Sequence, residues 1–196
     1  MLKLEKAGDS HQLNLSKSED LEKSTISVNL DWEELKSVKR GLFGKKIPAD
    51  LDLGCMYELK NGEKGVIQPL GKNFGSKNSS PYIYLDKDDR TGATAGENMY
   101  VFRPDLISRV MFFALIYQGA PDFQSVQGRM LFKVSNNEQI YLELNNPHAN
   151  CPFCAAATIL NNNNKISITK DERYFGGHRL ADKYYKFGFN WTAGSK

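Results

Sequence analysis

The segment Asp86-Lys-Asp-Asp-Arg-Thr-Gly-Ala-Thr-Ala-Gly-Glu-Asn98 is the stretch around which the rest of the chain is organised. It places three aspartates within four residues and then a loop punctuated by Gly92 and Gly96, which allow tight backbone turns. The apolar runs on either side, Tyr82–Leu85 and Met99–Phe102, are typical of strands. Carboxylates this close repel one another unless water, a basic side chain or a cation separates them. Among cations, Ca²⁺ takes about 6–8 oxygen ligands at roughly 2.3–2.6 Å.

A second acidic pair lies earlier, in the alternating run Asp50-Leu-Asp-Leu-Gly-Cys-Met-Tyr-Glu-Leu59. In a strand, Asp50 and Asp52 would lie on one face. The two clusters together predict a cation site at the loop end of an all-β domain. The alternative interpretation is that both clusters are solvated turn residues, and the EF-hand pattern is absent. The candidate metal ligands are Asp50, Asp52, Asp86, Asp88, Asp89, Glu97 and Asn98.

The same residues carry a family resemblance. The chain resembles the bacterial tellurium-resistance stress proteins of the TerD/TerA group, which share an Asp-Leu-Asp stretch and an Asp-Asn-Arg-Thr-Gly-x-Gly-x-Gly-Asp-Asp-Glu loop. TerA-type sequences are the more similar of the two types. The matching segments here are Asp50-Leu-Asp-Leu-Gly-Cys55, Leu85-Asp-x-Asp-Asp-Arg-Thr-Gly92, Tyr174-Phe-Gly-Gly-His-Arg179 and Trp191-x-Ala-Gly-Ser-Lys196.

The resemblance implies a β-sandwich that binds one or two Ca²⁺ ions in loops at one end, with no catalytic reaction and no catalytic residues. It also implies action through other stress or tellurite-resistance proteins, including membrane-associated complexes. The acidic loop departs from the TerD pattern, because Gly96-Glu97-Asn98-Met99 replaces Gly-Asp-Asp-Glu. Two carboxylates are therefore missing, which predicts fewer or weaker ions than a TerD-type loop would hold.

Composition limits the other functions. A length of 196 residues suits one domain, and we expect residues 1–196 to form a single calcium-binding sandwich. The net charge of +3 makes no case for nucleic-acid binding. No apolar run approaches the ~20 residues of a membrane helix, and the amino terminus lacks the apolar core of a signal peptide. The odd cysteine count of 3 favours a reducing compartment, so we expect a cytoplasmic protein.

Short alternating runs separated by polar turns predict an all-β, two-sheet β-sandwich with one short helix near the C-terminus. Asn61-Gly62 is the strongest hairpin signal. We expect the helix over Arg179–Tyr185 and a last strand over Phe187–Trp191. The remaining predicted strands are Leu2–Ala7, Gln12–Ser16, Thr25–Trp32, Asp50–Leu59, Lys64–Leu70, Arg109–Tyr117, Arg129–Val134, Gln139–Leu144, Cys154–Leu160 and Ile166–Thr169.

A rival signal is Cys151-Pro-Phe-Cys154, preceded by His148. A Cys-x-x-Cys pair can act as a redox dithiol. With His148 and a fourth ligand such as Cys55 or His178, it could instead hold zinc. The following run is typical of a strand and no βαβ pattern surrounds it, so structural cysteines are the favoured interpretation.

Two hypotheses follow from the sequence. The first is a non-enzymatic calcium-binding protein of a stress or tellurite-response system. The second is a thiol- or zinc-dependent redox or metal-handling protein that uses Cys151 and Cys154. The resemblance favours the first. His178 is interpreted as a structural histidine, because no nucleophile with an acidic orienting group is identifiable beside it.

Overall fold

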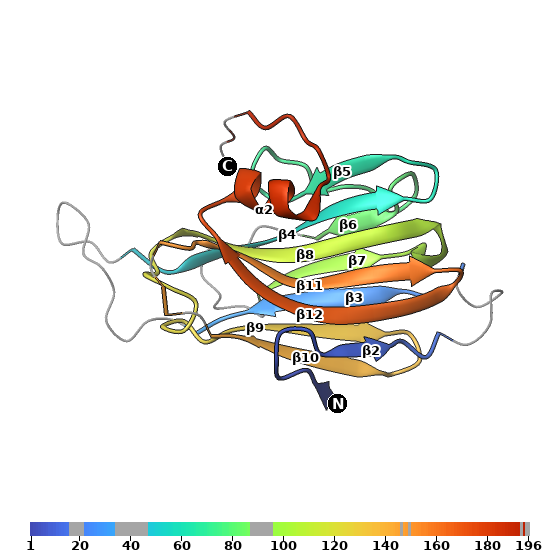
Figure 1. The fold of residues 1–196 in the computed structure, drawn as a ribbon, viewed down its shortest axis with the longest axis horizontal. Helices are drawn as coiled ribbons and strands as arrows, with labels where there is room; N and C mark the ends of the chain where they lie inside the picture. Colours follow the sequence, from blue (N-terminus) through green and yellow to red (C-terminus); the bar gives the residue numbers. More distant parts are fainter. Residues whose placement is uncertain are drawn as a thin grey trace.

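The computed structural model describes residues 1–15, 22–33, 47–86, 96–145, 147–148, 150–192 and 194. In this part of the chain, two six-stranded sheets pack face to face (Figure 1). Sheet A has the order β1-β10-β9-β3-β7-β6, formed by Leu2–Lys3, Gln139–Leu144, Gly128–Val134, Ile26–Asp31, Glu97–Val101 and Ile83–Leu85. Sheet B has the order β2-β12-β11-β8-β4-β5, formed by Ser10–Gln12, Lys165–Phe175, Phe153–Asn162, Ile107–Gln118, Asp50–Leu59 and Lys64–Ile67.

The inter-sheet core follows from strand alternation. In β3, Ile26, Val28 and Leu30 are fully buried, whereas the intervening residues are half-buried. Because successive side chains of a strand point to opposite faces, the alternation fixes which face of β3 meets sheet B. Phe112 of β8 and Phe132 of β9 meet across the core with ring centroids 5.4 Å apart. The all-β sandwich predicted from the sequence is confirmed.

Part of the outer face of sheet B is buried as well. A second apolar cluster covers this face, and it joins strand residues such as Met56 and Phe113 to Ala181 and Phe187 near the C-terminus. The covering element is helix α2 (His178–Tyr185), which lies over the sheet in Figure 1. Gly54 is required here, because a Cβ atom at this position would lie 2.2 Å from the Phe113 ring.

The predicted elements match the structure closely at the centre of the chain and less well near its ends. The strand Asp50–Leu59 and the helix at 179–185 are confirmed, and the structure also has a short 3₁₀ helix, η1 (Pro104–Leu106). The predicted strand Phe187–Trp191 is wrong. Those residues form an irregular segment whose backbone is bound by the Asp182 side chain instead of a neighbouring strand.

Candidate metal centre

Asp50 and Asp52 lie in the first half of β4, where both are buried to 1% exposure. Strand β5 pairs only with Cys55–Glu58 of β4, so the first half pairs with β8 alone among the described strands. Leu51 and Leu53 belong to the inter-sheet core. Asp52, which alternates with them, therefore lies on the outer face of sheet B. Burial of carboxylates is costly unless positive charge or hydrogen bonds compensate it.

Glu97 begins β7 of the opposite sheet and is completely buried. It shares the inward face of β7 with Met99, and its Oε2 accepts a hydrogen bond of 2.6 Å from the backbone N–H of Leu53. The carboxylate thus reaches β4 at a position that β5 does not cover. The preceding Gly96 has φ +69°, and a Cβ atom there would lie 1.9 Å from the Leu30 carbonyl oxygen. Only glycine allows β7 to begin this close to β3.

Asp86 and Asn98 form a separate pair at the base of the β6–β7 hairpin. The Asn98 backbone N–H and side-chain amide donate to the two carboxylate oxygens of Asp86, each at 3.2 Å. Asn29 in turn donates to Asn98 Oδ1 at 2.9 Å. Because Asn98 follows Glu97 in the strand, the two side chains point to opposite faces of β7. The structure therefore brings Asp86 to Asn98, and Glu97 to the Asp50–Leu53 segment.

Asp88 and Asp89 lie outside the described residues, so the predicted seven-residue set is described only in part. Within the described ranges, no group of three or more His, Cys, Asp or Glu side chains is arranged to hold a metal ion. The donor chemistry nevertheless fits a hard cation, because Asp50, Asp52 and Glu97 offer only oxygen atoms. Asp31, another acidic residue near this end of the sandwich, forms an ion pair with Arg129, with 2.6 Å between Asp31 Oδ2 and Arg129 Nη2.

The described residues give no evidence for the rival site at the cysteines. All three are free thiols, and Cys55 and Cys154 are fully buried in the inter-sheet core. Burial raises the pKa of the Cys154 thiol far above its ordinary value, which suppresses the reactive thiolate. The His178 ring forms a hydrogen bond with the Gln68 side chain on the outer side of sheet B. Nothing in the described residues supports a redox pair or a zinc site at Cys151 and Cys154.

The sequence reasoning missed an arrangement around the C-terminal helix. Asp182 of α2 accepts hydrogen bonds from the backbone N–H groups of Gly188 and Phe189 and from the indole N–H of Trp191, at 2.8, 2.9 and 2.9 Å. These bonds hold the C-terminal strap, residues 187–192, against the helix. The only sequence signal was an acidic residue within a helix followed closely by a Gly- and Trp-containing segment.

The fold and the carboxylate-lined end of β4 define the chain as an all-β sandwich domain with a candidate site for a hard cation. The chain is similar to the Tellurium resistance protein TerA of Alcaligenes sp, with 34% identity over 177 residues. This similarity, which covers 87% of the chain, confirms the resemblance inferred from the sequence and supports a TerA-type tellurium-resistance family.

The matched region spans 52% of that relative, so the chain corresponds to about half of its length. No family model matches the chain. Among the helices that the structure describes, none is long and apolar enough to cross a membrane.

Proposed function

We propose that this chain is a non-enzymatic, calcium-binding module of a tellurium-resistance or related stress response, and that it acts through partner complexes in the cytoplasm. The tellurium-resistance part rests on the similarity to TerA. The calcium part rests on one observation, the burial of Asp50, Asp52 and Glu97 around the first half of β4. The proposal assigns no catalytic reaction to the chain.

The physical argument for a cation concerns charge burial. Moving an ionised carboxylate out of water is costly, and nearby like charges raise the cost. A bound divalent cation, which prefers carboxylate oxygens, would lower the repulsion between neighbouring ionised carboxylates. Glu97 of β7 and the Asp50–Asp52 end of β4 are proposed to contribute ligands. Because no three acids of the described region are already arranged to hold a metal ion, Asp88 and Asp89 are proposed to complete the set.

Calcium is favoured over magnesium by the type of ligand. Carboxylates from two sheets and from the segment that carries Asp88 and Asp89 suit the variable coordination of Ca²⁺, whereas Mg²⁺ demands near-octahedral geometry and retains its waters. Asp86 is the weakest member of the proposed set, because both of its oxygens already accept hydrogen bonds from Asn98.

Two measurements test the proposal. Elemental analysis of purified protein should find calcium, and calorimetric titration of metal-free protein should show saturable heat with Ca²⁺ and much weaker heat with Mg²⁺. Asp52→Asn should weaken Ca²⁺ binding, whereas Glu5→Gln, which alters an exposed carboxylate outside the site, should not. Equal Ca²⁺ binding by wild type and the Asp52→Asn variant would remove Asp52 from the site.

A further inference from the structure

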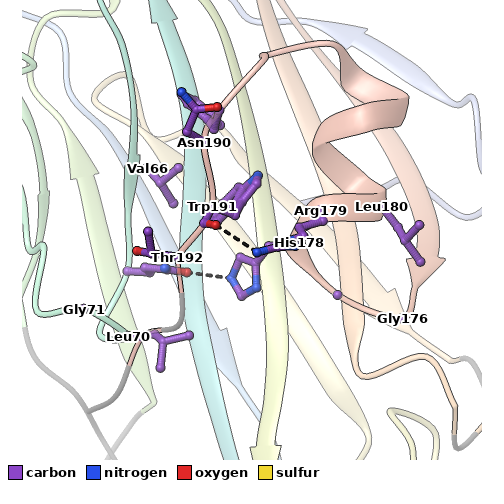
Figure 2. A pocket seen from close by; sticks show the side chains of 14 residues that line it. Val66, Leu70, Gly71, Gly176, His178, Arg179, Leu180, Asn190, Trp191 and Thr192 are labelled. Carbon is purple, nitrogen blue, oxygen red and sulfur yellow. Dashed lines mark hydrogen bonds between the residues drawn. The ribbon is translucent and has the colours of Figure 1, made fainter.

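A concave pocket lies on the outer face of sheet B, between the end of β5, the start of α2 and the C-terminal strap (Figure 2). Its volume is about 530 Å³. That size is within the range of roughly 300–1,000 Å³ typical of small-molecule pockets. None of the seven candidate metal ligands lines it, so this pocket is independent of the proposed calcium site.

His178 lies in this pocket with its ring held in a fixed orientation. Its Nε2 lies 2.7 Å from Gln68 Oε1, which is an acceptor, so Nε2 carries the proton. The ring packs against Phe113, Phe153 and Trp191, with centroid distances of 5.4, 5.0 and 5.0 Å. This apolar environment lowers the pKa of His178 to about 4, so the imidazole is neutral near pH 7. Neutral His178 therefore contributes ring surface and no charge.

The strap gives the pocket its aromatic wall. Asp182 fixes the Trp191 indole N–H, and Phe189 packs edge-on against the same indole at 5.8 Å between centroids. Val66, Leu70 and Leu180 add aliphatic surface on the other sides. These side chains form an apolar lining suited to a flat, ring-containing molecule.

Among the described residues, Arg179 is the only charged residue that lines the pocket, and no Asp or Glu of this part of the chain lines it. Within the described part of the chain, Arg179 makes no ion pair, and its hydrogen bond is to the Trp191 carbonyl oxygen at 2.9 Å. A guanidinium group has five N–H donors, so most of the Arg179 donors remain for another acceptor. Asn190 and Thr192 supply further polar groups at the rim. The pocket is therefore positive, with apolar and aromatic walls.

We propose that this pocket binds a small organic anion with a flat apolar body and a carboxylate or phosphate head group. Arg179 recognises the head group through charge-assisted hydrogen bonds, which both head groups accept in the same fork geometry. The Trp191, Phe189 and His178 rings contact the body.

The two tryptophans of the chain provide a direct readout. The Trp191 indole N–H reports on the strap, whereas the Trp32 indole N–H donates to the Ala49 carbonyl oxygen in the core and serves as an internal reference. The probes are 2-naphthoate, 2-naphthyl phosphate and the neutral 2-naphthamide. Each is titrated into ¹⁵N-labelled protein while both indole resonances are followed.

The expected result is a saturable shift of the Trp191 resonance alone, with at least one anion bound about tenfold more tightly than the amide. Arg179→Gln should abolish this preference for the anion, and Arg179→Lys should retain it. Lys183→Gln is the matched control, because Lys183 is exposed one helical turn away and does not line the pocket. An unmoved Trp191 resonance, or the same anion preference in wild type and Arg179→Gln, would overturn the proposal.

Discussion

Glu97 of β7 and Leu53 of β4 join the two sheets through a buried hydrogen bond of 2.6 Å from the Leu53 N–H to the Glu97 carboxylate. The carboxylate occupies the place that a neighbouring strand would take, since β5 pairs with β4 only from Cys55 onward. The bond uses one lone pair of Oε2. A carboxylate has about four such sites, so the same side chain can satisfy the strand and bind a cation.

This double role predicts different effects of two substitutions at Glu97. Glu97→Ala leaves the Leu53 N–H buried without its acceptor, so unfolding free energy in EDTA should fall by about 1–3 kcal/mol. Glu97→Gln keeps an acceptor oxygen and should retain most of that stability, yet it should lose much of the Ca²⁺ affinity. Urea denaturation in EDTA and calorimetry with Ca²⁺ measure the two effects. If both variants are equally unstable without metal, the hydrogen bond is not the main role of Glu97.

A second prediction concerns Asp182 and the strap. Asp182→Ala removes the acceptor of three hydrogen bonds, so the strap should detach and the Trp191 indole N–H should exchange with solvent much faster. Stability should fall by about 2–3 kcal/mol, because hydrogen bonds to a charged group are worth about 1.5–3 kcal/mol each and these three are not additive. The Trp32 indole N–H should stay protected.

Asp9→Ala is the matched control for that variant. The Asp9 carboxylate also accepts two backbone N–H bonds, but near the amino terminus and away from the strap. Its loss should leave Trp191 exchange unchanged. Rapid Trp191 exchange already present in the wild type would contradict the structural role given to Asp182.

The third prediction concerns pH. Burial lowers the pKa of folded-state His178 to about 4 from its ordinary value of 6.5. Between pH 4 and pH 6.5 the unfolded chain binds more protons at His178 than the folded chain does. The contribution of neutral His178 to the free energy of unfolding is therefore fully present above pH 6.5 and is lost as the pH falls to 4. The loss should reach about 3 kcal/mol, at 1.36 kcal/mol per pKa unit. His178→Phe should remove this part of the pH dependence in urea titrations. An unchanged slope between pH 6.5 and 4 would show that His178 titrates normally.

The fourth prediction concerns the thiols. Cys151 is partly exposed, whereas burial in the core raises the pKa of the Cys55 and Cys154 thiols. Native protein treated with iodoacetamide at pH 8 should therefore gain one adduct by mass spectrometry, and Cys151→Ser should gain none. Cys151→Ser with Cys154→Ala should keep the Ca²⁺ affinity within about twofold, since thiolate chemistry has no role in the proposed site. Stoichiometric zinc that disappears in the double variant would revive the rival hypothesis.

The sandwich could be predicted because most of its strands alternate clearly or are bounded by glycine and asparagine turns. β10 and β4 match their predicted bounds. The segment 187–191 also alternates, and local pattern alone predicted a strand there. Its conformation is decided by Asp182, a side chain several residues away whose hydrogen bonds replace those of a strand ladder. Local periodicity does not report such a contact.

The candidate site was predictable in composition but not in arrangement. The acidic segments pointed to Asp50, Asp52 and Glu97, which the structure places near the uncovered part of β4. The predicted strand began at Met99, whereas β7 begins at Glu97. Because β7 begins two residues earlier, Glu97 and Asn98 lie within the strand and their side chains point to opposite faces of the sheet. Asp86, which is bound to Asn98, therefore lies on the other face from Glu97.

We propose that Ca²⁺ binds among the acidic side chains at the first half of β4. Filling such a site stabilises the native state by mass action, by roughly 2.7 kcal/mol at ~100-fold excess of ligand over Kd. Asp52→Asn should reduce that gain. The same variant should be no less stable than wild type in EDTA, because it relieves repulsion between neighbouring carboxylates.

The most direct test is a thermal melting curve of the wild-type protein in EDTA, in Ca²⁺ and in Mg²⁺, with Asp52→Asn and Glu5→Gln measured alongside. Millimolar Ca²⁺ should raise the midpoint of wild type and Glu5→Gln by several degrees, Asp52→Asn should respond less, and Mg²⁺ should have little effect. A wild-type midpoint that millimolar Ca²⁺ leaves unmoved would contradict the account.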